Sequence, residues 1–101
     1  MHTLDELRDD IDRVDEVLVR LLNERARVAC EIGRIKKMQG IEVYQPEREK
    51  QVLANVRGIA AEGPLGADAI ARLFERIIDE ARRLERRLVH GEDGSPGVTN
   101  T

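Results

Sequence analysis

Two basic side chains interrupt an otherwise apolar face of the first predicted helix. Apolar residues recur at alternating intervals of three and four, at Leu4, Leu7, Ile11, Val14, Leu18, Leu21, Val28, Ile32 and Ile35. This spacing predicts a helix with one apolar seam, and Arg25 stands at a seam position. Lys36 follows eleven residues later, which is about three turns on and about 20° from the same direction. Two cations roughly 16 Å apart on one face suit the binding of an anionic ligand between them.

Three more charged residues share a helix face with apolar neighbours. Arg48 and Glu49 lie on faces that continue with apolar residues, and Glu85 lies seven residues after Ile78 and three before Leu88. Structural interpretations stay open beside the functional one. An arginine stem can pack along the core while its head reaches water, charges often decorate a helix start, and Glu85 could pair with an arginine.

Together, Arg25, Lys36, Arg48, Glu49 and Glu85 predict a polar site between facing helices, with cations that suit a carboxylate or a phosphate. The sequence offers no other chemistry of comparable strength. It has no cluster of His and Cys for a metal, no Ser–His–Asp set and no Gly-rich phosphate loop. An enzyme built on this site is therefore expected to use no cofactor, no metal and no nucleophile.

Three helices are expected to position these side chains in an all-α fold. The first opens at a capping box formed by Thr3 and Glu6 and runs to about Met38. The second, shorter helix begins at Pro46, whose missing N–H costs nothing in a first turn. The third, of medium length, spans about residues 67 to 90. Both loops between the helices contain glycine, which marks the breaks.

The composition is typical of a soluble helical protein and excludes several partners. Of 101 residues, 37% are charged and 2% aromatic, and the net charge is −3. We expect no nucleic-acid binding, because basic and acidic residues are interspersed, and no membrane span, because no apolar run approaches about 20 residues. Cys30 cannot form an internal disulfide and fits a reducing cytoplasm. The expected organisation is one helical domain over residues 1–91 and a disordered tail over residues 92–101.

The predicted helix lengths favour a homodimer. The first helix is about 50 Å long, whereas the second and third are roughly 20 and 35 Å. Two shorter helices cannot cover both sides of the long one. The seam of the first helix is therefore expected to meet its own copy across a two-fold axis.

Several short segments occur in an order that resembles one known family. They are Leu7-Arg8, Asp15-Glu16, Leu21–Arg25, Ile32–Lys36, Gln45–Glu49, Arg72–Phe74 and Ile77-Ile78. Over residues 4 to 88 the chain resembles the all-helical chorismate mutase family. The resemblance implies an intertwined helical homodimer that converts chorismate to prephenate, by a Claisen rearrangement, in phenylalanine and tyrosine biosynthesis.

The resemblance also assigns roles to individual residues. Arg25 and Arg8 of the partner subunit would hold the two carboxylates of the substrate. Lys36 would contact the ether oxygen and one carboxylate, Glu49 would accept a hydrogen bond from the ring hydroxyl, and Arg48 would support the charge balance. Catalysis would rest on Lys36, Arg25 and Glu85.

Three positions depart from parts of the family. Glu85 stands where some members have an amide, and a carboxylate donates a hydrogen bond only when protonated. Gln45, a further expected substrate contact, stands where some members have an acid, and Ala81 replaces a hydroxyl. Two other functions stay open: an isochorismate pyruvate lyase on the same fold, and a helical dimerisation or regulatory module without catalysis. A partner enzyme of the aromatic pathway is also conceivable.

Overall fold

Three helices make up the fold. The computed structural model describes residues 1–91, in which α1 spans Leu4–Gln39, α2 spans Pro46–Ala60 and α3 spans Ala67–His90. No strand occurs in this part of the chain. The predicted all-α class and the order of one long, one short and one medium helix are confirmed. The tail expected over residues 92–101 lies outside the described residues, and the domain limits of 1–91 stay a prediction.

The ends of α1 are set by local signals. The Thr3 hydroxyl accepts a hydrogen bond from the Glu6 backbone N–H at 3.1 Å, and the Glu6 carboxylate accepts one from the Thr3 N–H at 2.8 Å. Gly40 ends the helix with φ of 67°, a left-handed conformation that glycine adopts without a Cβ clash. Its 36 residues give a helix of about 54 Å, close to the longest dimension of the molecule, 55 Å.

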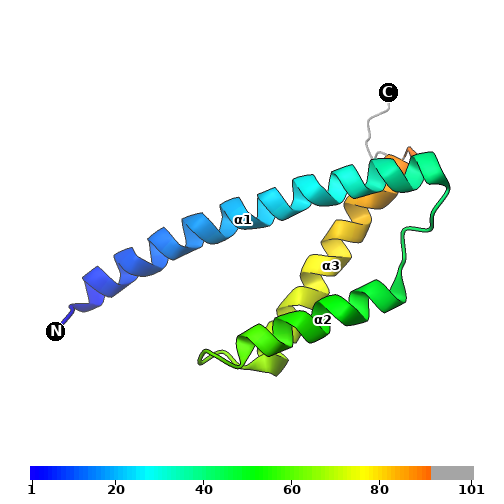
Figure 1. Cartoon of the computed structure of the whole chain (residues 1–101). Helices are drawn as coiled ribbons and strands as arrows, with labels where there is room; N and C mark the ends of the chain where they lie inside the picture. Colours follow the sequence, from blue (N-terminus) through cyan, green and yellow to red (C-terminus); the bar gives the residue numbers. More distant parts are fainter. Residues whose placement is uncertain (92–101) are drawn as a thin grey trace.

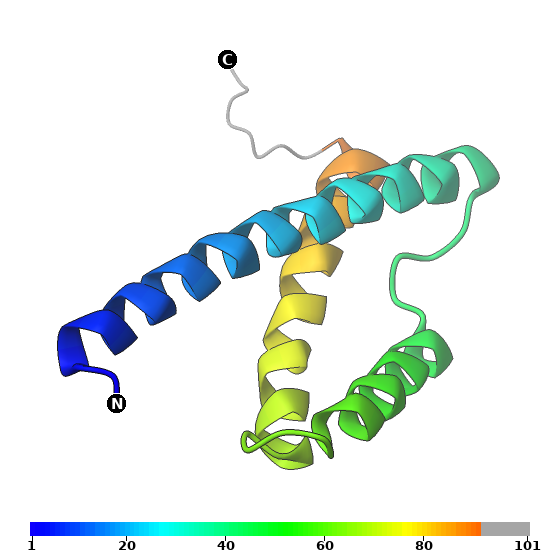
Figure 2. The ribbon, with the colours of Figure 1, turned by 60° about the vertical axis from the view of Figure 1, so that its left-hand side comes forward.

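The helices form an open arrangement in which α3 packs against both α1 and α2. Helix α3 packs against the C-terminal half of α1, and α2 packs against α3 (Figure 1). Among the described residues, α1 and α2 have no packing contact of their own. The N-terminal half of α1 projects away from both of the other helices (Figure 2), and every residue from 11 to 24 is exposed.

A single chain buries little apolar surface. Within residues 1–91 the buried apolar residues are Ala29, Val43, Ala71 and Ile78, and none of the side chains there is completely enclosed. Seam residues such as Leu18 and Leu21 are 51% and 61% exposed. The radius of gyration is 17.3 Å, against about 13 Å for a compact domain of about 100 residues. The seam that should stabilise the folded protein is therefore left uncovered in one chain.

An ion pair ties the end of α2 to the start of α3. The Arg57 guanidinium donates a hydrogen bond of 2.7 Å to Asp68, and this bond and the Arg57 charge lower the pKa of the Asp68 carboxyl below its usual range. Because the pKa is lowered in the folded state, the pair stabilises at neutral pH and loses its effect as the pH falls through that pKa. The exposure of both groups keeps the effect small.

None of the described helices combines the length and the apolar character that crossing a membrane requires.

Gly33 allows the close approach of α1 and α3. A Cβ built at this position would lie 3.2 Å from the Cα of Glu85 and 3.2 Å from the Cδ1 of Leu88. We expect Gly33→Ala to destabilise the protein by about 1 kcal/mol, because the cost of overpacking exceeds the gain in helix propensity. Urea denaturation measures the difference.

Gly58, in α2, is the matched control. A Cβ there would meet nothing within 4 Å, so Gly58→Ala should stabilise the protein by about 0.5–1 kcal/mol. Stabilisation by both substitutions would show that the approach of α3 to Gly33 is not tight.

Candidate active site

A cavity opens where the C-terminal half of α1, the following loop, α2 and α3 meet. Its volume is about 580 Å³. Its lining residues are Arg25, Val28, Ala29, Ile32, Ile35, Lys36, Ile41, Val43, Gln45, Arg48, Glu49, Val52, Ile78, Ala81, Arg82 and Glu85. Nine of these sixteen residues are aliphatic and seven are polar or charged, so the cavity combines apolar walls with convergent polar groups, as small-molecule sites do.

Six of the seven residues expected at the site line this cavity. Arg25 and Lys36 come from α1, the other four from the end of the loop, α2 and α3. Arg8 does not: it lies on the projecting half of α1, its side chain is 69% exposed, and its nearest acid is Asp5 at 3.8 Å. The structure of one chain therefore gathers the site that the sequence predicts, except for the residue expected from a partner subunit.

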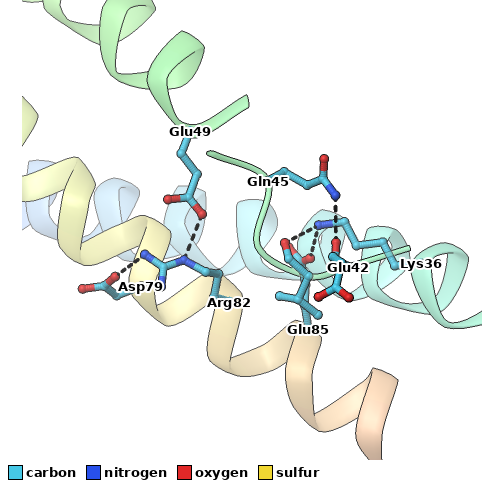
Figure 3. A network of polar contacts seen from close by, with 8 residues as sticks. Lys36, Glu42, Gln45, Glu49, Asp79, Arg82 and Glu85 are labelled. Carbon is cyan, nitrogen blue, oxygen red and sulfur yellow. Dashed lines mark hydrogen bonds and ion pairs between the residues drawn. The ribbon is translucent and has the colours of Figure 1, made fainter. Parts of the chain in front are cut away.

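The most buried polar contact of the cavity joins Lys36 to Glu85. The Lys36 ammonium lies 2.7 Å from the Glu85 carboxylate and donates a second hydrogen bond of 2.9 Å to the Val43 carbonyl (Figure 3). The two charged side chains are 14% and 10% exposed. The sequence left an arginine open as the structural partner of Glu85, whereas the partner in the structure is a lysine. Three elements, α1, α3 and the loop, thus fix the position of one cation.

The other predicted residues are held less tightly. The guanidinium carbon of Arg25 lies 6.0 Å from the centre of the Phe74 ring. Arg25 lines the cavity, and no carboxylate within residues 1–91 forms an ion pair with it. Arg48 donates to Gln51 at 2.6 Å, and the Gln45 amide donates to the Glu42 carbonyl at 3.0 Å.

Arg82 lines the cavity and was missed in the sequence analysis. Its Nε lies 2.9 Å from a Glu49 carboxylate oxygen, and its Nη2 donates to Asp79 at 2.6 Å (Figure 3). The signal was present, because Arg82 lies four residues after Ile78 and three before Glu85, on the same face of α3. Its neighbours in the sequence include several solvated arginines, and the pattern alone does not separate it from them.

The cavity carries a net positive charge. Arg25, Lys36, Arg48 and Arg82 supply four cations and Glu49 and Glu85 two carboxylates, which leaves +2. Such a site can hold a small dianion whose apolar body packs on the aliphatic walls. No group of three His, Cys, Asp or Glu side chains within residues 1–91 is placed to bind a metal ion.

The described residues form an all-helical fold with a cavity of net positive charge. Comparison with known proteins identifies its family. Residues 7–86 match the sequence profile of the family described as Chorismate mutase type II. The chain belongs to this family.

Individual relatives agree with the profile. The chain is 36% identical over 91 residues to a bifunctional chorismate mutase/prephenate dehydratase of Aquifex aeolicus, over 87% of this chain and 25% of that protein. It is 29% identical over 84 residues to a chorismate mutase of Methanocaldococcus jannaschii, over 83% of this chain and 85% of that protein. It is 33% identical over 96 residues to a 4-amino-4-deoxychorismate mutase of Streptomyces pristinaespiralis, over 95% of this chain and 74% of that protein. The chain spans about a quarter of the length of the bifunctional relatives.

Removing one partner of the Lys36–Glu85 pair should leave a charge that water cannot reach freely. We expect Lys36→Met to lower the free energy of unfolding by about 2 kcal/mol, less than for a fully buried pair because both groups retain some exposure. The double variant Lys36→Met/Glu85→Leu should regain most of this loss. Urea denaturation of the single and double variants measures the coupling.

Lys37→Met, at the neighbouring exposed lysine, is the control and should change stability by no more than about 0.5 kcal/mol. Additive losses in the double variant would contradict a coupled pair.

Proposed function

We propose that this chain catalyses the rearrangement of chorismate to prephenate. The observation that carries the proposal is the convergence of Arg25, Lys36, Arg48, Glu49 and Glu85 on one cavity of net positive charge, in a chain of this family. The same residues were assigned to the site from the sequence. Chorismate is a diacid, so its charge complements that of the cavity.

The protein takes no covalent part in this reaction. A Claisen rearrangement breaks one C–O bond and forms one C–C bond within a single molecule, with no proton transfer and no enzyme-bound intermediate. The flexible substrate must be held in a compact, chair-like shape, which is catalysis by proximity and orientation. Aliphatic walls and separated cations serve this purpose by fixing the body and the carboxylates of the substrate.

Lys36 is the residue proposed to act on the breaking bond. Partial negative charge develops on the ether oxygen as the C–O bond lengthens, and a prepositioned ammonium stabilises it. Contacts with Glu85 and Val43 hold the Lys36 ammonium in place before the substrate arrives. We therefore assign Glu85 chiefly to positioning Lys36, since a direct hydrogen bond from Glu85 to the ether oxygen requires its protonated form.

The remaining substrate contacts follow from the family. Arg25, which has no acidic competitor within residues 1–91, is proposed to bind one carboxylate, with Arg48 supporting the charge balance. Glu49 and Gln45 line the cavity where the ring hydroxyl of the substrate is proposed to lie.

The second carboxylate is proposed to bind Arg8 of the partner subunit in an intertwined homodimer. Arg8 precedes Arg25 by seventeen residues, about 25 Å along the same helix, so it cannot reach the cavity of its own chain. The exposed seam of α1, which includes Leu18 and Leu21, gives the two long helices an apolar surface on which to pair.

Coupling to other enzymes and cellular location stay predictions. Relatives named as bifunctional with prephenate dehydratase place the mutase activity beside a second activity in one protein. We propose that the present chain supplies the mutase portion, and that a partner enzyme of the same pathway could act with it. We also propose the cytoplasmic location that the single cysteine, Cys30, suggests.

The activity is tested by incubating the purified chain with chorismate and identifying the product. We expect prephenate, and we expect Arg25→Ala to lower kcat/KM by at least about a hundredfold, because a carboxylate anchor is lost. Arg27→Ala, whose side chain is exposed and pairs with Glu24, is the control and should retain full activity. Pyruvate release from isochorismate without prephenate formation would favour the lyase, and loss of neither substrate would favour a non-catalytic module.

The shared site is tested by mixing two inactive variants. Unfolding and refolding Arg8→Ala together with Arg25→Ala yields mixed dimers in which one site has both arginines intact. Random pairing makes about half of the dimers mixed, so about a quarter of the parental activity should return. A mixture no more active than its separate components would contradict a site built from two chains.

A further inference from the structure

We propose that Arg82 determines the specificity of the site: by neutralising Glu49, it makes the cavity favour a diacid with a neutral ring hydroxyl over an analogue with an ammonium there. This inference rests on the proposed function and deepens it. Its starting point is that Glu49, like Glu85, is already paired with a cation of the protein.

The contact between Arg82 and Glu49 is an ion pair of partly buried groups. The Arg82 Nε lies 2.9 Å from the Glu49 oxygen, and the side chains are 25% and 21% exposed. The Nε has no hydrogen-bond partner within the described residues, because its N–H is not aligned with the Glu49 oxygen. Charge attraction between two groups with limited access to water, more than a directed hydrogen bond, therefore governs the contact.

Two further contacts hold the Arg82 guanidinium in place. Asp79, one turn earlier on α3, accepts a hydrogen bond of 2.6 Å from Nη2. The ring of Tyr44, from the loop before α2, lies under the guanidinium, with 5.6 Å between the guanidinium carbon and the ring centre. A guanidinium supported by α3 and by the loop is preorganised to face Glu49 from α2 (Figure 3).

The pairing changes what Glu49 can recognise. A carboxylate near a fixed arginine still accepts a hydrogen bond from a hydroxyl, since its oxygens offer more than one lone pair. An ammonium in the same position would gain less from Glu49, because the nearby arginine repels it and already offsets the charge of the carboxylate. The cavity as a whole, with a net charge of +2, accepts a dianion better than a molecule with an additional positive group.

The alternative is that Arg82 merely ties α2 to α3. A structural tie would lower stability and slow both substrates by a similar factor when broken. A specificity residue changes the ratio of the two rates, which a loss of stability does not.

The experiment compares chorismate with 4-amino-4-deoxychorismate as substrates of four proteins. They are the parent, Arg82→Met, Arg82→Met/Glu49→Gln and Arg83→Met. Methionine keeps much of the apolar stem and removes the charge. Arg83→Met is the control, because Arg83 is exposed, outside the cavity and paired with Glu80. The readout is the ratio of kcat/KM for the two substrates, with thermal unfolding measured alongside.

We expect the parent and Arg83→Met to prefer the hydroxyl substrate. Arg82→Met should move the ratio toward the ammonium analogue by about tenfold, the scale of one newly available ion pair. The double variant should lose that shift, because the carboxylate that would bind the ammonium is gone.

Three results would overturn the proposal: an unchanged ratio in Arg82→Met, an equal fall for both substrates together with a lower melting temperature, or a shift that persists without Glu49. If the parent converts neither substrate, the proposed function is wrong, but the specificity proposal can still be tested. The readout is then the ratio of the Kd values for the two diacids, compared between the parent and the variants. An Arg82→Met shift in that Kd ratio would still support the charge argument, and its absence would refute it.

Discussion

The approach of α3 to the C-terminal half of α1 is the constraint on which the cavity depends. Gly33 lets the two helix backbones come close, and near this contact Glu85 reaches across to Lys36. The same lysine holds the loop through the Val43 carbonyl. One polar cluster thus joins α1 to the loop that directly follows it and to α3, where Glu85 lies 49 residues after Lys36. The cost of removing both charges from water is offset only while all of these contacts are made.

A single chain leaves the apolar seam of α1 without a packing partner. Half of α1 contacts neither of the other helices, and its apolar seam faces outward. A short chain with few aromatic residues cannot form a thick core, and pairing of long helices is the economical remedy. The proposed dimer would cover the seam and bring Arg8 to a cavity that lacks it. Assembly and activity would then depend on the same helix.

The helices were predictable because their signals are local. Thr3 with Glu6, Gly40 and Pro46 each act within a few residues, so boundaries could be read without knowing the packing. Arg25 and Glu85 were recognisable because they interrupt regular apolar patterns. Partners across the fold were not predictable. The lysine partner of Glu85 depends on how α3 packs against α1, and the Tyr44 ring beneath Arg82 depends on the path of the loop. No local pattern specifies either.

Direct observation of a bound diacid would test the central claim, that this cavity fixes the substrate with Arg25 at a carboxylate and Lys36 at the ether oxygen. A crystal structure with a bicyclic diacid that mimics the chair-like transition state provides it. We expect one carboxylate on Arg25, the other on Arg8 of the partner subunit, and the ether oxygen within hydrogen-bond distance of the Lys36 ammonium. A diacid bound outside the cavity, or bound with Lys36 turned away from the ether oxygen, would contradict it.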